Sequence, residues 1–181
     1  VIIDEAYVDY GNESCVPLVR KYPNLVVIQT FSKSRNMAGA RIGYAISSQE
    51  IIEDMNKIKF TFNPFNMSSL AITAGTAAVK DTEYLEKCVT TTIETRKYFE
   101  KEVEKLGFLV CPTTTNFAFI KHPKLDAGKI TKELKDRGIL VRHYQNERIS
   151  AYLRVTIGSR EEMEQVIKEL KDIVESALCV C

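Results

Sequence analysis

Short apolar runs alternate with polar turns through the first quarter of the chain. The runs lie at residues 1–4, 25–28 and 42–46, and runs of this length predict buried strands. Apolar side chains fall on both faces of residues 1–4, which is typical of a strand in a parallel sheet that is covered on both sides. Residues 12–21 contain Pro17 and predict a loop with a short helix.

The pattern then changes to helical spacing. Apolar residues three and four positions apart predict a helix over residues 48–57, with Ser48 at its N-cap. Pro64 interrupts this pattern. We therefore expect residues 63–66 to form a loop that carries exposed aromatic side chains.

A longer helical stretch runs from residue 68 to about residue 106. Asp81, with Glu83 in the turn that follows, predicts that a second helix begins within this stretch. Gly107 predicts the end of that helix, because glycine favours the left-handed conformation that closes helices. We expect a domain boundary inside the second helix, near residue 90.

The last part of the chain predicts an α+β unit. One helix is expected at residues 127–137, closed by Gly138, and another at residues 159–177, opened by the capping box Ser159-x-x-Glu162. The predicted strands are residues 108–111, 116–120, 139–142 and 152–157.

Composition excludes several classes of protein. With 181 residues and a formal net charge of +1, the chain can bury one good core or two small ones, and its charge does not favour nucleic acid or an anionic membrane. No apolar run reaches the roughly 18 residues of a membrane span, and no signal-peptide layout is present. The five scattered cysteines favour reduced thiols in the cytoplasm over a disulfide frame or a metal site. Those at residues 179 and 181 fit a frayed end better than a metal site.

The candidate chemistry centres on Lys33, which follows the apolar run 25–28 in a cluster of small polar residues. A lysine at a strand end can present its amine to a ligand, although a surface lysine in a connecting loop is the commoner case. Thr30, Ser32 and Arg41 are donors suited to a phosphate. The first apolar run ends in acidic residues. Strand, acid, strand and lysine thus follow in the order required by a cofactor with a basic ring nitrogen, an aldehyde and a phosphate.

The motifs DEAY at residues 4–7, TFSK at residues 30–33 and GARIGY at residues 39–44 resemble the pyridoxal-phosphate-dependent aminotransferases of fold type I. The later segments ILVRHY and YLRVTIGSREEM are most similar to the histidinol-phosphate aminotransferase branch. The resemblance implies an α/β fold that forms the C-terminal half of such an enzyme. Residues 1–90 would be part of the mixed-sheet large domain that binds the cofactor, and residues 91–181 the small α+β domain.

The chain opens at Val1, inside a predicted strand, which also indicates the second half of a longer protein. In the family, a phosphate loop, a ring-stacking aromatic and an asparagine precede the DEAY strand, and the partner subunit supplies a tyrosine. The resemblance therefore implies that this piece alone is inactive and that the full-length protein is a homodimer. It also places the 63–66 loop near the cofactor and the subunit interface; a loop packed on its own core is the alternative.

The resemblance assigns roles to matching positions. Lys33 supplies the amine that condenses with the cofactor's aldehyde, and it moves the proton at the substrate's Cα. Asp4 is the charge partner of the ring nitrogen, and Tyr7 donates to the phenolic oxygen. The cofactor's phosphate is assigned to Thr30, Ser32 and Arg41.

Other polar residues have weaker assignments. Glu5 could also partner the ring nitrogen, but it should point to the opposite face of its strand. Arginine presents a planar fork to carboxylates and phosphates, and the resemblance gives Arg154 the substrate's anion. Arg142 closes a predicted strand and is either a second anion contact or a surface cation. His122 and His143 lack partners at metal-ligand spacing; His143 could line the substrate cleft, but a solvated loop position is the default.

The resemblance implies a reaction between histidinol phosphate and 2-oxoglutarate that yields imidazole acetol phosphate and glutamate, in histidine biosynthesis. No metal is expected. One alternative is another aminotransferase, or an amino-acid-phosphate decarboxylase, of the same superfamily. The other is a non-catalytic α/β binding or dimerisation module, against which the joint presence of the lysine, the aspartate and the arginines argues.

Overall fold

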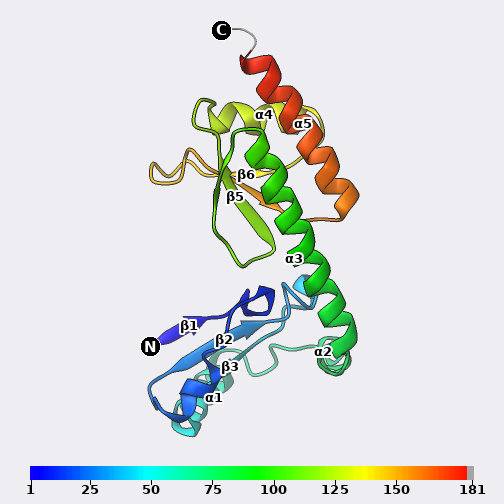
Figure 1. The fold of residues 1–181 in the computed structure, drawn as a ribbon. Coiled ribbons are helices and arrows are strands. Elements are labelled where there is room, and N and C mark those ends of the chain that lie inside the picture. The colour runs from blue at the N-terminus through cyan, green and yellow to red at the C-terminus, as the bar shows by residue number, and fades with distance from the viewer. Residues whose placement is uncertain (179–181) are drawn as a thin grey trace. The chain divides into compact units, whose positions relative to one another are not determined.

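The computed structural model describes residues 1–178, whose backbone divides into two compact units. The first unit comprises residues 1–89, and the second begins at residue 90, within helix α3 (Thr82–Lys105) (Figure 1). The assignment of these units to the large and small domains of an aminotransferase stays a prediction. The expectation of a frayed end at residues 179–181 lies outside the described residues.

The first unit is built on a mixed three-stranded sheet in the order β1-β2-β3. Strand β1 (Ile2–Asp4) pairs in parallel with β2 (Val26–Thr30), and β2 pairs in antiparallel fashion with β3 (Gly43–Ile46). Each strand lies within two residues of its predicted range. Three short 3-10 helices lie in the connections, at Val8–Tyr10, Val16–Arg20 and Ala38–Ala40.

Burial of this sheet is one-sided, which the sequence pattern did not predict. Val27 is fully buried, whereas its neighbour Ile28 is 38% exposed and Ile2 is 68% exposed. Successive side chains of a strand point to opposite faces of the sheet, so one face is covered and the other is open in residues 1–178. The expectation that β1 is covered on both faces is therefore wrong for the structure described.

Two helices follow the sheet, α1 (Gln49–Phe62) and α2 (Ser69–Lys80). Helix α1 is longer than predicted. Ser48 stands at its N-cap, but its side chain accepts no backbone N–H of the helix and its hydroxyl donates to the Pro23 carbonyl (2.9 Å). The loop between the helices exposes 92% of Phe65, which contradicts the alternative of a loop packed on its own core.

Helix α2 packs against the segment that carries Lys33. The buried cluster of this unit contains Phe31, Ile42 and Ala71. Gly75 lies so close to them that an added Cβ would be 2.9 Å from Ile42 Cδ1. The absence of a side chain at this position therefore lets α2 approach the residues on either side of the lysine loop.

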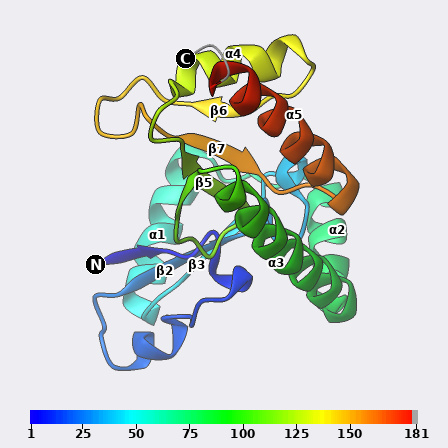
Figure 2. The same ribbon diagram turned by 45° about the horizontal axis from the view of Figure 1, so that its top comes forward.

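The second unit is an antiparallel four-stranded sheet with helices on one face (Figure 2). Its strands lie in the order β4 (Leu109–Cys111), β5 (Phe117–Lys121), β7 (Leu153–Thr156) and β6 (Arg142–His143). Helices α3, α4 (Ala127–Asp136) and α5 (Arg160–Leu178) supply most of the rest of its core. Buried residues from all three helices meet the inward side chains of β5 and β7: Ala118, Ile120, Leu153 and Val155.

Helix termini of the second unit follow local sequence signals. Gly107, at φ 88°, ends α3, and Ser159 and Glu162 form the reciprocal capping box, with bonds of 3.2 and 2.7 Å. At the start of α3, Asp81 Oδ1 accepts the N–H of Tyr84 (3.0 Å). These predictions are confirmed. None of the helices in residues 1–178 is both long and apolar enough to cross a membrane.

The strand predicted at residues 139–142 is wrong in its bounds. Pairing with β7 is limited to Arg142 and His143, because only these two residues face Arg154 and Leu153 in register. The residues before them turn towards the helices instead: Ile139 and Val141 pack against the core.

Candidate functional site

The residues assigned to the cofactor gather at one edge of the first sheet. Parallel β1 and β2 end there, at Asp4 and Thr30, and antiparallel β3 begins there, with Gly43 paired to Thr30. We call this the carboxyl edge. Lys33 follows it two residues beyond Phe31, and Arg41 precedes it. Ligands of open sheets bind outside the carboxyl ends of parallel strands, so the topology brings these side chains to a position suited to a ligand.

The amine of Lys33 is poised beside an aromatic ring. Its Nζ lies 5.3 Å from the centroid of the Tyr7 ring, and within residues 1–178 it forms no hydrogen bond or ion pair. The cation–ring contact orients the amine without engaging its hydrogen-bonding capacity. Lys33 therefore has an amine that is free to react or to bind.

Two of the three residues proposed as phosphate donors, Thr30 and Arg41, already make side-chain hydrogen bonds. The Thr30 hydroxyl donates to the Ile42 carbonyl (3.3 Å) and accepts the N–H of Ser32 (3.1 Å), which shapes the turn before Lys33. Arg41 is exposed, in the left-handed conformation at φ 56°, and one guanidinium N–H donates to the Ala38 carbonyl (3.0 Å). Guanidinium has five N–H donors, so most of those of Arg41 remain for an anion.

The two acidic residues of β1 and its extension have different surroundings. Asp4 is exposed, and its Oδ1 accepts only the N–H of Ala6 (2.9 Å) among the bonds of the described chain. Glu5 is buried, and its carboxylate accepts hydrogen bonds from Ser14, Cys15 and Gln29. The Glu5 carboxylate thus holds the segment between β1 and β2 in place, whereas the Asp4 carboxylate is available to a ligand.

These bonds also set the acidity of Glu5. Burial alone would raise the pKa of its carboxyl, but the hydrogen bonds from the Cys15 backbone, Gln29 and Ser14 outweigh that effect and lower the pKa below its ordinary value of 4.5. A lowered pKa means that the ionised form is stabilised by folding. Glu5 therefore contributes stability above its ordinary pKa, and this contribution is lost as the pH falls through the lowered value.

We expect Glu5→Gln to lower the free energy of unfolding by about 1–3 kcal/mol at neutral pH, because an amide N–H would face donors and leave them unpaired. The variant should also lose the acid-dependent part of the stability curve. Urea unfolding at neutral pH and at pH values below 4.5 measures both effects. Glu13→Gln, at an exposed position nearby, is the matched control. Equal stabilities of the two variants would contradict the structural role of Glu5.

Other residues that hold the lysine loop were missed by the sequence analysis. The buried Ser34 hydroxyl donates to the Asp9 carboxylate, and Arg35 donates to the Ala78 carbonyl (2.6 Å) at the end of α2. Burial, with Asp9 nearby, raises the pKa of Tyr10 to about 12. Ser34 lies in the cluster of small polar residues around Lys33, but nothing in the sequence links it to Asp9. The Thr30 hydrogen bonds before Lys33 and these two contacts after it thus hold the lysine loop on both sides.

The two candidate substrate arginines lie side by side in the second unit. Arg142 on β6 pairs in register with Arg154 on β7, and Arg154 pairs in turn with Phe119 on β5. All three occupy the face of the sheet opposite the helices, since their neighbours Ala118, Leu153 and Val155 lie in the core. Two arginines placed opposite each other repel unless an anion lies between or beside them.

Neither arginine has an ionic partner in the part of the chain that is described. The guanidinium of Arg154 lies 5.3 Å from the centroid of the Phe117 ring, and its buried Nε has no hydrogen-bond partner among residues 1–178. The guanidinium of Arg142 lies 5.5 Å from the Tyr144 ring. Buried polar groups are normally paired, so the orphaned Nε of Arg154 points to an anionic ligand.

Both histidines are engaged within the second unit. His122 is buried, its Nδ1 accepts the N–H of Lys124 (3.2 Å), and burial lowers its pKa. His143 is half-buried in β6, with Nε2 2.7 Å from the Ser150 carbonyl, which corrects the expectation of a solvated loop position. Residues 1–178 contain no group of three or more His, Cys, Asp or Glu side chains that could hold a metal ion.

The carboxyl edge fits pyridoxal phosphate in the chemistry of its donors. It presents an amine without a hydrogen bond at Lys33, an exposed carboxylate at Asp4, and an exposed guanidinium at Arg41. A pyridine nitrogen, an aldehyde and a phosphate need a carboxylate, an amine and a cation respectively. The residues present would hold such a group.

Comparisons with known proteins agree with this chemistry. Histidinol-phosphate aminotransferase from Clostridium botulinum (strain Okra / Type B1) is 47% identical to the chain over 174 residues, which are 96% of this chain and 49% of that protein. The enzyme of the same name from Chromohalobacter salexigens is 47% identical over 173 residues, with the same coverage. The chain thus spans about half the length of these relatives.

Solved structures confirm the predicted fold class. Histidinol-phosphate aminotransferase from Clostridium acetobutylicum superposes with a TM-score of 0.88 at 28% identity, over 97% of this chain and 54% of that one. The Sinorhizobium meliloti enzyme, solved in complex with pyridoxal-5'-phosphate, gives 0.86 at 28% identity, over 97% and 49%. Pyridoxal phosphate is therefore the cofactor of this group of proteins, as the resemblance implied. Residues 1–170 match the model of aminotransferase class I and II, and the chain belongs to that family.

Proposed function

We propose that the protein containing this chain transfers the amino group of histidinol phosphate to 2-oxoglutarate, forming imidazole acetol phosphate and glutamate. The observation that carries the proposal is the amine of Lys33, without a hydrogen bond or ion pair in residues 1–178, at the same sheet edge as Asp4 and Arg41. The names of the relatives support the choice of histidinol phosphate. Histidine biosynthesis is the process to which this reaction belongs.

Each residue of the carboxyl edge has a separate task in this proposal. Bound pyridoxal phosphate supplies an electron-withdrawing ring. Lys33 Nζ would hold the cofactor through its aldehyde, and once released would remove the substrate's Cα proton as a general base. The Asp4 carboxylate would accept a hydrogen bond from the protonated ring nitrogen, and the Tyr7 hydroxyl would donate one to the phenolic oxygen. The phosphate is held by Thr30, Ser32 and Arg41.

The paired arginines of the second unit bind the anions of the two alternating substrates. Arg154 carries the main role because its Nε is buried and orphaned. Arg142, directly opposite in register, adds a second positive charge that suits a phosphate better than a carboxylate. The proposal thus assigns the glutamate carboxylate to Arg154 and the phosphorylated substrate to both.

We further propose that the active protein is a cytoplasmic homodimer, and that the 181-residue chain alone is inactive. The resemblance supports the dimer. Cys15 and Cys111 form no disulfide within the described residues, which fits a reducing compartment.

The test is an assay of the complete reading frame that contains this chain, beside the 181-residue chain alone. Purified protein is given pyridoxal phosphate, histidinol phosphate and 2-oxoglutarate, and glutamate formation is followed. Carbon dioxide release from an amino-acid phosphate is measured in parallel, because decarboxylases are the nearest alternative. Decarboxylation without glutamate formation, or transamination of other amino acids alone, would overturn the proposal.

Asp4→Asn should allow the cofactor to bind but slow Cα proton abstraction by about 100-fold or more, because the ring nitrogen loses its ionic partner. Exposed Asp4 has one local hydrogen bond, so the fold should survive the change. Single-turnover measurement with glutamate isolates the affected step. Glu13→Gln, at an exposed position of the same unit, is the matched control for the loss of one negative charge. A normal single-turnover rate in Asp4→Asn would mean that this carboxylate does not contact the ring.

A further inference from the structure

Arg96 is a buried charge that the proposed mechanism does not use. It lies on α3 in the second unit and is only 4% exposed. Its Nε faces Glu100 Oε1 at 3.7 Å, too long for a hydrogen bond, and both atoms lack a hydrogen-bond partner in residues 1–178. Burying an arginine costs desolvation free energy, and the distant Glu100 offsets only part of it. Arg96 therefore needs a further stabilising interaction.

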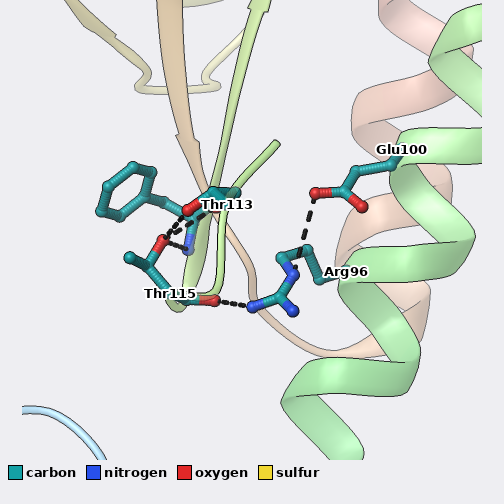
Figure 3. A network of polar contacts seen from close by, with 5 residues as sticks. Arg96, Glu100, Thr113 and Thr115 are labelled. Atoms are coloured by element: carbon teal, nitrogen blue, oxygen red, sulfur yellow. Dashed lines mark hydrogen bonds and ion pairs between the residues drawn. The ribbon is translucent and has the colours of Figure 1, made fainter. Parts of the chain in front are cut away.

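That interaction is made with the turn before β5, as Figure 3 shows. Arg96 Nη1 donates to the Thr115 carbonyl. The Thr115 hydroxyl donates to the Phe117 carbonyl (3.1 Å) and accepts the Phe117 N–H (3.3 Å), and the Thr113 hydroxyl lies 2.8 Å from it. Because Thr115 uses its proton on Phe117, Thr113 is the donor of the hydroxyl pair. The turn is thus closed by side chains, and Arg96 fixes it to the helix.

The same turn leads directly to Arg154. Phe117, whose backbone Thr115 holds at both polar atoms, carries the ring that lies 5.3 Å from the Arg154 guanidinium. Phe117 also pairs in register with Thr156, two residues beyond Arg154 on β7. A displacement of the turn would therefore move the ring on which this guanidinium rests.

We propose that Arg96 is a positioning residue for Arg154: it fixes the turn of residues 113–115, which sets the Phe117 ring against the guanidinium that binds the substrate's anion. The inference rests on the proposed function of Arg154 as a substrate contact. Arg96 itself does not touch substrate. It acts by limiting the orientations of the arginine that does, and its ion pair with Glu100 holds Arg96 in turn.

The test uses the complete reading frame loaded with pyridoxal phosphate. Arg96→Met should raise the KM for glutamate by about 10- to 100-fold, the scale expected from misplacing a binding group by about an ångström. The affinity for pyridoxal phosphate should stay the same, because its contacts are in the first unit. On an Arg154→Ala background, Arg96→Met should raise the KM for glutamate no further. A purely stabilising role for Arg96 would lower thermal stability without this dependence on Arg154.

Two other variants keep the inference testable if Arg96→Met fails to fold. Thr115→Val retains the carbonyl that Arg96 binds but removes the hydroxyl bonds to Phe117, so it should raise the KM for glutamate several-fold. Arg137→Met is the matched control, since it removes an arginine paired with Glu133 and Glu169 on the helical side of the unit. Its KM should be unchanged.

The outcomes separate this inference from the proposed function. If Arg154→Ala raises the KM for glutamate while Arg96→Met and Thr115→Val do not, the positioning role is wrong and the role of Arg154 stands. Additive effects of Arg96→Met and Arg154→Ala would also overturn it. If Arg154→Ala leaves the KM for glutamate unchanged, Arg154 is not a substrate contact, and the positioning role of Arg96 is wrong as well.

Discussion

Replacing Lys33 with alanine is expected to abolish transamination by the complete reading frame, with a rate loss of about 10,000-fold or more, while leaving the fold intact. The large effect follows because one amine both holds the cofactor and moves the Cα proton, and residues that perform such joint roles show the largest losses. The fold should survive because the Lys33 amine forms no hydrogen bond or ion pair in residues 1–178, so its removal leaves no polar partner unpaired.

Borohydride reduction of the protein with bound pyridoxal phosphate, followed by peptide mapping, measures covalent attachment at Lys33 directly. Lys21→Ala is the matched control, since Lys21 Nζ also lies over a tyrosine ring, 5.4 Å from the centroid of Tyr22, away from the carboxyl edge. The control should keep both attachment and activity. Attachment of the cofactor to another lysine in the Lys33→Ala protein would contradict the assignment.

Elements whose signals are local could be predicted from the sequence. The capping box of Ser159 and Glu162, the N-cap Asp81 and the closing Gly107 each depend on residues within one helical turn, and all three formed as expected. The predicted order of strand, acid, strand and lysine also agrees with the structure. Asp4 ends β1 and Lys33 follows β2, and these two strands are parallel neighbours whose carboxyl ends share an edge.

Features that depend on distant parts of the chain could not be predicted. Ser48 is of a residue type that favours N-caps, but its hydroxyl is directed to the Pro23 carbonyl, 25 positions away, and does not cap the helix. The contact of Ser34 with Asp9 joins residues 25 positions apart, and that of Arg96 with Thr115 joins residues 19 apart. No periodicity or capping rule reports on such pairs. The residues that hold the candidate site in place are therefore less predictable than the residues that perform its chemistry.

Arg154→Ala should raise the KM for glutamate and for histidinol phosphate together. Loss of a charge-assisted pair in a closed site costs about 2–5 kcal/mol, or roughly 30- to 5,000-fold in apparent affinity. The structural reason is that the guanidinium of Arg154 lacks an ionic partner, and its buried Nε lacks any hydrogen-bond partner, among residues 1–178. The affinity for pyridoxal phosphate should barely change, because Thr30, Ser32 and Arg41 are the proposed contacts of its phosphate.

Steady-state kinetics of both half-reactions, with Arg142→Ala measured alongside, tests this division of labour between the paired arginines. Arg142 is exposed and lies over the Tyr144 ring. Its loss should mainly weaken binding of the phosphorylated substrate, because a dianionic phosphate gains most from a second positive charge. Arg148→Ala, at an exposed loop position, should leave both KM values unchanged. An Arg154→Ala protein with unaltered kinetics for glutamate would show that the orphaned guanidinium serves the fold of the second sheet rather than the substrate.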